Sequence, residues 1–155
     1  MDGIVGPLDS GAASRTEPGR TPDGLEGHCL CGAVAYRCEG PPLWVAYCHC
    51  ESCRRACSAP FTTFFAVLHG RWEWTRAVPV LHRSSARVRR HFCATCGSQM
   101  SYQWDGAPDE MHFYAASLSD PDAVTPTGHD FADERLSWIH LADVPPEGRG
   151  LSRQG

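Results

Sequence analysis

At 155 residues, with 42% hydrophobic and 21% charged residues, the chain has the composition of one ordinary globular domain. Its formal net charge of −4 argues against nucleic acid as the main partner. All 14 basic residues are arginine, so mechanisms that need a lysine as Schiff base or general base are excluded.

The first segment of the chain, 1–24, is rich in Gly, Pro, Ser, Asp and Thr and predicts a flexible tail. A folded domain is expected at 25–145, followed by a second flexible tail at 146–155. No apolar run approaches the roughly 18 residues that a transmembrane helix needs. The N-terminus has neither the positive nor the apolar region of a signal peptide. We therefore expect a cytoplasmic protein with no membrane partner.

From residue 25 onward, short β-like runs alternate with turn residues. Only 53–57 and 120–123 have patterns that allow a helical turn. The composition of the runs predicts a mostly β fold of short strands held together by metal. Eight strands are expected, at 33–38, 43–47, 61–68, 71–75, 79–83, 87–92, 98–104 and 111–116.

Cysteine spacing is the strongest chemical signal. Seven of the nine cysteines form three clusters, Cys29-x-Cys31, Cys48-x-Cys50-x-x-Cys53 and Cys93-x-x-Cys96. Such pairs bring two sulfurs within reach of one tetrahedral zinc, with Zn–S bonds near about 2.3 Å. Two pairs make one closed four-thiolate site, and the triplet then leaves three sulfurs and an open coordination position. An open position indicates an enzyme rather than a purely structural metal.

Spacing alone leaves the pairing of the clusters open. Cys93 and Cys96 could share a metal with Cys50 and Cys53, or with the first cluster of the chain. Both metals could also serve only to stabilise the fold. Redox pairs are disfavoured, because no thioredoxin-like βαβ pattern surrounds the clusters.

Three stretches resemble the signatures of one family. Residues 26–36 resemble the opening signature of the glutathione-dependent formaldehyde-activating family, which also includes centromere protein V. Residues 48–55, with 58–61, resemble its middle signature, and 92–98 its third. The resemblance covers about 25–145 and implies the β-tent fold of short antiparallel strands.

The resemblance also implies two zinc ions per chain with different roles. It identifies a structural site and a catalytic site, and implies a carbon–sulfur lyase that joins or separates a thiol such as glutathione and a small aldehyde such as formaldehyde. The alternative, suggested by centromere protein V, is a non-catalytic zinc-stabilised scaffold for a protein partner. The implied structural ligands are Cys29, Cys31, Cys93 and Cys96, and the implied catalytic ligands are Cys48, Cys50 and Cys53.

Several residues beside the middle cluster are secondary candidates. Cys57 lies one helical turn after Cys53 and could be a fourth zinc ligand, a reactive thiol or core packing. Ser58 stands where the family often has glycine. Arg54 and Arg55 could bind a glutathione carboxylate, although surface arginines without a specific contact are the simpler interpretation.

The remaining motifs have structural interpretations. The basic run 87–91 predicts a strand with Arg87, Arg89 and His91 on a solvated face. Cys38 is expected in the core. The aromatic residues of the apolar runs are also expected in the core: Phe61, Phe64, Phe65, Trp72 and Trp74. His28 flanks a structural ligand and is expected beside the metal site or in solvent, and His140 lies in a C-terminal segment that resembles the family's closing motif. His49 lies between two ligands, and its side chain should point away from the metal that they share.

Overall fold

The computed structural model describes residues 24–141 and contains two separate β-sheets and one α-helix in that part of the chain. The mostly β prediction is confirmed. Of the helices in residues 24–141, none is long and apolar enough to cross a membrane. The predicted tails lie outside the described residues, except that Gly24 already belongs to the first strand.

The smaller sheet has three antiparallel strands in the order β1-β2-β5. These strands cover Gly24–His28, Ala35–Glu39 and Trp72–Trp74. The two tryptophans of β5 contact each other edge to face, with ring centroids 5.3 Å apart. They pack against the buried core, as their spacing in the sequence predicts.

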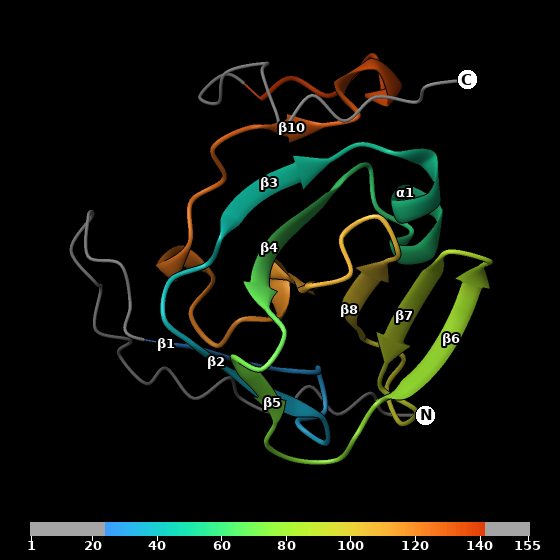
Figure 1. Ribbon diagram of the computed structural model, residues 1–155. Helices are drawn as coiled ribbons and strands as arrows, with labels where there is room; N and C mark the ends of the chain where they lie inside the picture. The colour runs from blue at the N-terminus through green and yellow to red at the C-terminus, as the bar shows by residue number, and fades with distance from the viewer. Residues whose placement is uncertain (1–23, 142–155) are drawn as a thin grey trace, which may run out of the picture.

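The larger sheet has seven strands in the order β10-β3-β4-β9-β8-β7-β6 (Figure 1). All its neighbours pair antiparallel except β10 and β3, which run parallel. Its strands are β3 Trp44–Cys48, β4 Thr62–Leu68, β6 Val80–Ser85, β7 Val88–Phe92, β8 Gln99–Trp104, β9 Glu110–Tyr114 and β10 His129–Asp130.

All eight predicted strands are confirmed, and two strands were missed. Strand β10 has only two residues, too few to form a pattern. Strand β1 alternates exposed and buried residues, but its sequence GLEGH lacks the β-branched and aromatic residues that mark a strand.

The core lies between the two sheets. Tyr36 of β2 stacks on Phe113 of β9, with ring centroids 4.2 Å apart, and Phe113 also stacks on Phe65 of β4. A Cβ atom on Gly27 would overlap the Tyr36 hydroxyl, so β1 can approach this tyrosine only with glycine there. Cys38 is fully buried in the same cluster, as expected.

Helix α1, Glu51–Cys57, connects the end of β3 to β4 and lies close to the ends of β7 and β8 (Figure 1). Its N-cap is Cys50, whose sulfur accepts a hydrogen bond from the Cys53 N–H at 3.3 Å. Its C-cap is Ser58, which adopts the left-handed conformation with φ 49°. The helix is longer than the predicted turn because the cysteine N-cap starts it two residues earlier. Short 3₁₀ turns follow at Ala115–Ser117, Pro121–Ala123 and Ala132–Glu134.

Candidate metal centres and the adjoining cavity

The first and third cysteine clusters come together in space. Cys29 and Cys31 follow β1 of the smaller sheet, and Cys93 and Cys96 follow β7 of the larger one. The four sulfurs all lie within 4.8 Å of one another. The Cys31 sulfur is 3.5 Å from that of Cys29 and 3.8 Å from that of Cys93. This four-sulfur group therefore joins the two sheets.

Polar contacts favour the ionised form of two sulfurs in the four-sulfur group, those of Cys29 and Cys96. The Val34 N–H donates to the Cys29 sulfur at 3.2 Å. The Ser98 hydroxyl lies 3.3 Å from the Cys96 sulfur. Hydrogen bonds from the Ser98 side chain and backbone, followed by that of the Cys31 backbone, lower the pKa of the Cys96 thiol to about 5. A sulfur that is ionised at neutral pH is ready to bind a metal.

The middle cluster forms a second, separate group of three sulfurs. Cys48 ends β3, Cys50 caps α1 and Cys53 lies in the first turns of that helix. Their sulfurs also lie within 4.8 Å of one another, with 3.6 Å between those of Cys48 and Cys50. Cys48 and Cys53 are buried, so the group sits below the surface.

Both groups fit zinc. Two sulfurs bound to one tetrahedral zinc at about 2.3 Å stand roughly 3.8 Å apart. The sulfur separations of 3.5, 3.8 and 3.6 Å are close to that value. Thiolates are also the soft donors that zinc accepts in structural and catalytic sites. Each group could thus hold one metal ion, the first with four protein sulfurs and the second with three.

Arg90 of β7 is the main site residue that the sequence did not indicate. Its guanidinium is 3.6 Å from the Cys53 sulfur and donates to the Ser52 hydroxyl and the Tyr114 hydroxyl, both at 3.1 Å. It also lies over the ring of Tyr102, 4.9 Å from the centroid. The side chain is only 3% exposed.

The charge of Arg90 and the ionisation of Cys53 support each other. Hydrogen bonds with Cys48 and Cys50, together with the charge of Arg90, lower the pKa of the Cys53 thiol well below its ordinary value. Burial, the largest single effect, opposes the charge on Arg90, but the charges and hydrogen bonds of Cys53 and Tyr114 together outweigh it and raise the pKa of the guanidinium. Of the three sulfurs, that of Cys53 is therefore the one whose ionised form is favoured, and it lies beside a permanent cation.

The basic run 87–91 forms the predicted strand, but its predicted solvated face is only partly exposed. His91 is buried, and its Nδ1 lies 2.8 Å from the Ser101 hydroxyl, so the predicted solvated face is wrong there. Arg89 pairs with Asp105 at 2.9 Å. Arg90 points to the opposite face because side chains alternate along a strand. Arg90 contacts Ser52 of α1 only because the tertiary fold brings the helix to this strand, and the local sequence does not reveal that contact.

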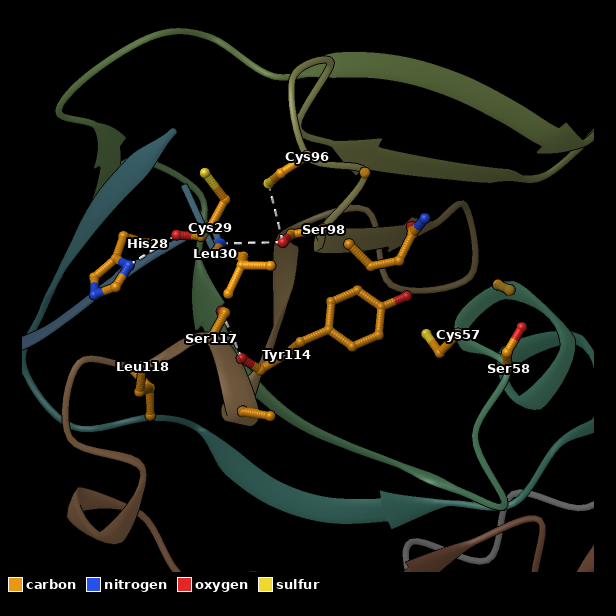
Figure 2. A pocket seen from close by; sticks show the side chains of 14 residues that line it. His28, Cys29, Leu30, Cys57, Ser58, Cys96, Ser98, Tyr114, Ser117 and Leu118 are labelled. Atoms are coloured by element: carbon orange, nitrogen blue, oxygen red, sulfur yellow. Dashed lines mark hydrogen bonds between the residues drawn. The ribbon is translucent and has the colours of Figure 1, made fainter. Parts of the chain in front are cut away.

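Cys57 is not part of the three-sulfur group. Its side chain is directed toward the Tyr114 ring (Figure 2). Both residues line a cavity of about 640 Å³, which Cys29 and Cys96 also line. Burial raises the pKa of the Cys57 thiol, and a hydrogen bond with Tyr114 opposes that effect. In this arrangement the second group keeps three sulfurs.

A separate cavity of about 380 Å³ opens onto the three-sulfur group. Phe64, expected only in the core, forms part of its wall. His112 also lines this cavity; it is 5% exposed, and its Nε2 lies 2.9 Å from Glu110 Oε2. The Trp44 indole N–H donates to the same carboxylate oxygen at 2.9 Å. Neither Glu110 nor His112 stands in a cysteine motif, so this pair could not be predicted from the sequence.

The structure does not bring Arg54 and Arg55 to that cavity. The Arg54 Nε–H donates to the His49 carbonyl at 2.9 Å, and Arg55 pairs with Glu51 at 2.8 Å. Both line a different cavity, of about 420 Å³, together with the exposed Trp138.

Of the histidines singled out in the sequence, His49 and His28 make hydrogen bonds within the fold and His140 faces solvent. His49 is fully buried, and its Nε2 lies 2.8 Å from His129 Nδ1, which fixes the ring toward β10. His28 is exposed and donates through Nδ1 to the Cys29 carbonyl at 2.9 Å. His140 is exposed.

Comparison with known proteins gives a consistent family match. The model of the family described as glutathione-dependent formaldehyde-activating enzyme matches residues 24–134. A lyase of Schizosaccharomyces pombe, otherwise uncharacterized, is 35% identical over 81 residues, which are 51% of this chain and 57% of that protein. A Halomonas elongata protein named for the same enzyme family is 26% identical over 127 residues, covering 76% of this chain and 80% of that protein.

One solved structure is similar throughout most of its length. The crystal structure of a Rhodobacter sphaeroides protein superimposes with a TM-score of 0.54 at 25% sequence identity. The match covers 66% of this chain and 92% of that chain.

Proposed function

Because this chain belongs to the glutathione-dependent formaldehyde-activating enzyme family, we propose that it is a zinc-dependent carbon–sulfur lyase acting on a thiol–aldehyde adduct. The family name suggests glutathione and formaldehyde as the thiol and the aldehyde. The observation that carries the proposal is the three-sulfur group, which is buried but opens onto a cavity.

Two zinc ions would be held by the two sulfur groups, with structural and catalytic roles. The four-sulfur group already offers the four ligands of a closed tetrahedral site. The group of Cys48, Cys50 and Cys53 leaves one position for a ligand from the cavity. When bound there, zinc would supply a soft Lewis acid that favours the ionised form of a substrate sulfur.

The reaction itself needs no oxidant or reductant. In the direction of synthesis, the thiol sulfur forms a bond to the aldehyde carbon. The carbonyl π bond breaks, and its electron pair moves to the oxygen, which becomes the hydroxyl oxygen. The proton lost by the thiol ends on the new hydroxyl, and cleavage reverses each step. His112 lines the cavity and is oriented by Glu110, so it is the side chain that we assign to carry this proton.

Exchange spectroscopy tests this function directly. With zinc-loaded protein, ¹³C-formaldehyde and glutathione, magnetisation transfer between formaldehyde hydrate and S-hydroxymethylglutathione should be faster than in buffer. Cys53→Ser should abolish the acceleration. Cys57→Ser is the matched control, because it lies on the same helix but outside the three-sulfur group, and it should retain the acceleration.

Two results would contradict the proposal. An exchange rate equal to that in buffer at full zinc loading, with 2-mercaptoethanol as well as with glutathione, would favour the alternative, a non-catalytic zinc-stabilised scaffold for a protein partner. Equal loss of activity in both cysteine variants would contradict the assignment of the three-sulfur group.

A further inference from the structure

The cavity at the three-sulfur group has several aromatic rings in its walls. Five rings from four separate parts of the chain surround it, so the apolar lining is built by the fold and not by one motif. Small or apolar residues, Val88 and Ala107 among them, complete the wall. The five rings belong to Trp44, Phe64, Tyr102, Trp104 and Phe131.

The carboxylates at this cavity disfavour an anionic ligand. Besides the sulfurs, Asp130 and His112 line it, and Glu110 is hydrogen-bonded to His112. Among the described residues that line it, none is an arginine. Glutathione carries two carboxylates, and each would lose hydration here without gaining an arginine partner.

The two arginines nearest to this cavity, Arg90 and Arg87, do not line it. Arg90 is bound to Cys53, Ser52 and Tyr114 and lines a different cavity. Arg87 lies over the ring of Trp104, 5.7 Å from its centroid, and is not part of the lining.

Phe131 is held in the cavity wall at a conformational cost. It follows β10 directly and has φ 54° and ψ 46°, the left-handed region that aromatic residues rarely adopt. In the described chain, the other non-glycine residue with positive φ is Ser58, at the C-terminus of α1. A ring kept in the wall despite an unfavourable backbone indicates that the ring itself serves the cavity.

We infer that the cavity selects a neutral thiol with an aromatic group, together with its aldehyde adduct, over glutathione. This inference rests on the proposed function, because the thiol sulfur is taken to reach the open position at the three-sulfur group. The aromatic group then lies among the five rings, and its burial supplies the preference.

Calorimetric titration of zinc-loaded protein with three thiols tests the selectivity. The probes are 2-phenylethanethiol, glutathione and 2-mercaptoethanol, which is small and neutral. We expect 2-phenylethanethiol to bind at least about tenfold more tightly than either of the others, since it buries one aromatic ring. Its alcohol analogue, 2-phenylethanol, should bind much more weakly because it lacks the sulfur.

A pair of glycine variants separates the role of the ring from a loss of stability. Phe131→Gly removes the ring and also relieves the left-handed backbone, so the protein should remain folded. We expect it to lose most of the preference for 2-phenylethanethiol and to keep the affinity for 2-mercaptoethanol. Ser58→Gly relieves the same kind of backbone away from this cavity and should keep the full preference.

The outcomes distinguish this inference from the proposed function. If 2-mercaptoethanol binds but glutathione binds as tightly as the aromatic thiol, the inference is wrong and the open metal site stands. An unchanged preference in Phe131→Gly would likewise overturn it. If none of the three thiols binds, both the inference and the proposed function fail.

Discussion

At the scale of single residues, the most consequential feature is a buried cation beside the three-sulfur group. Three thiolates and one divalent metal carry a net charge of about −1. The Arg90 guanidinium contacts the Cys53 sulfur, and its positive charge offsets this negative charge. It also reaches Ser52 on α1 and Tyr114 on β9, and it thereby fixes the helix against the sheet.

We predict that Arg90→Met weakens zinc binding at the three-sulfur group by about 10–100-fold, the usual effect of losing a group that supports metal ligands. Arg90→Lys should recover part of the loss because it restores the charge but not the forked hydrogen bonds. The measurement is zinc content during competition with a chelator. Arg89→Met, on the neighbouring residue, is the control. Equal zinc retention in the two methionine variants would show that the charge of Arg90 plays no part.

Cys38 gives a prediction on pH dependence. Burial raises the pKa of its thiol to about 12, against an ordinary value of 9.0. The unfolded chain therefore loses this proton first as the pH rises. The stability contributed by the neutral thiol is complete below pH 9 and is lost between about pH 9 and 12.

The measurement is urea unfolding of the wild type and of Cys38→Val at pH 8 and at pH 10.5. The free energy of unfolding should fall more steeply with pH in the wild type, because valine has no proton to lose. Parallel decreases in the two proteins would mean that Cys38 is not protected from ionisation.

At the scale of secondary structure, α1 is too short to be stable alone and depends on its ends. Cys50 caps its N-terminus through sulfur, so the same residue starts the helix and joins the three-sulfur group. The spacing of this cluster predicts that the three sulfurs come together, as they do in the structure. It did not predict the full helix, because a cysteine is not a usual N-cap residue.

Ser58 adopts a backbone conformation that favours glycine. Its left-handed φ of 49° is easy for glycine and unfavourable for a residue with a Cβ atom. We predict that Ser58→Gly raises the free energy of unfolding by about 1 kcal/mol and that Ser58→Val lowers it. Urea unfolding of the zinc-loaded proteins measures both. A lower stability for the glycine variant would contradict the strained C-cap.

At the scale of the whole molecule, the four-sulfur group connects two sheets that otherwise meet through the apolar core. The strands and the cysteine clusters could be predicted because each is encoded locally, by apolar runs such as 61–68 or by fixed spacing. Arg90, His112 and Phe131 could not, since their roles arise where separate strands meet. The short strand β10 places Asp130 and Phe131 at the cavity without a pattern of its own.

The most direct test of the account is X-ray absorption at the zinc edge, which counts the sulfur ligands. With four sulfurs at one zinc and three at the other, the zinc-loaded protein should show a mean of about 3.5 sulfurs per zinc. Saturation with 2-mercaptoethanol should raise this mean to about four. A mean of about four before any thiol is added would show that the second site is already closed. An unchanged mean after addition would show that no thiol reaches the metal, and either result would contradict an open catalytic zinc.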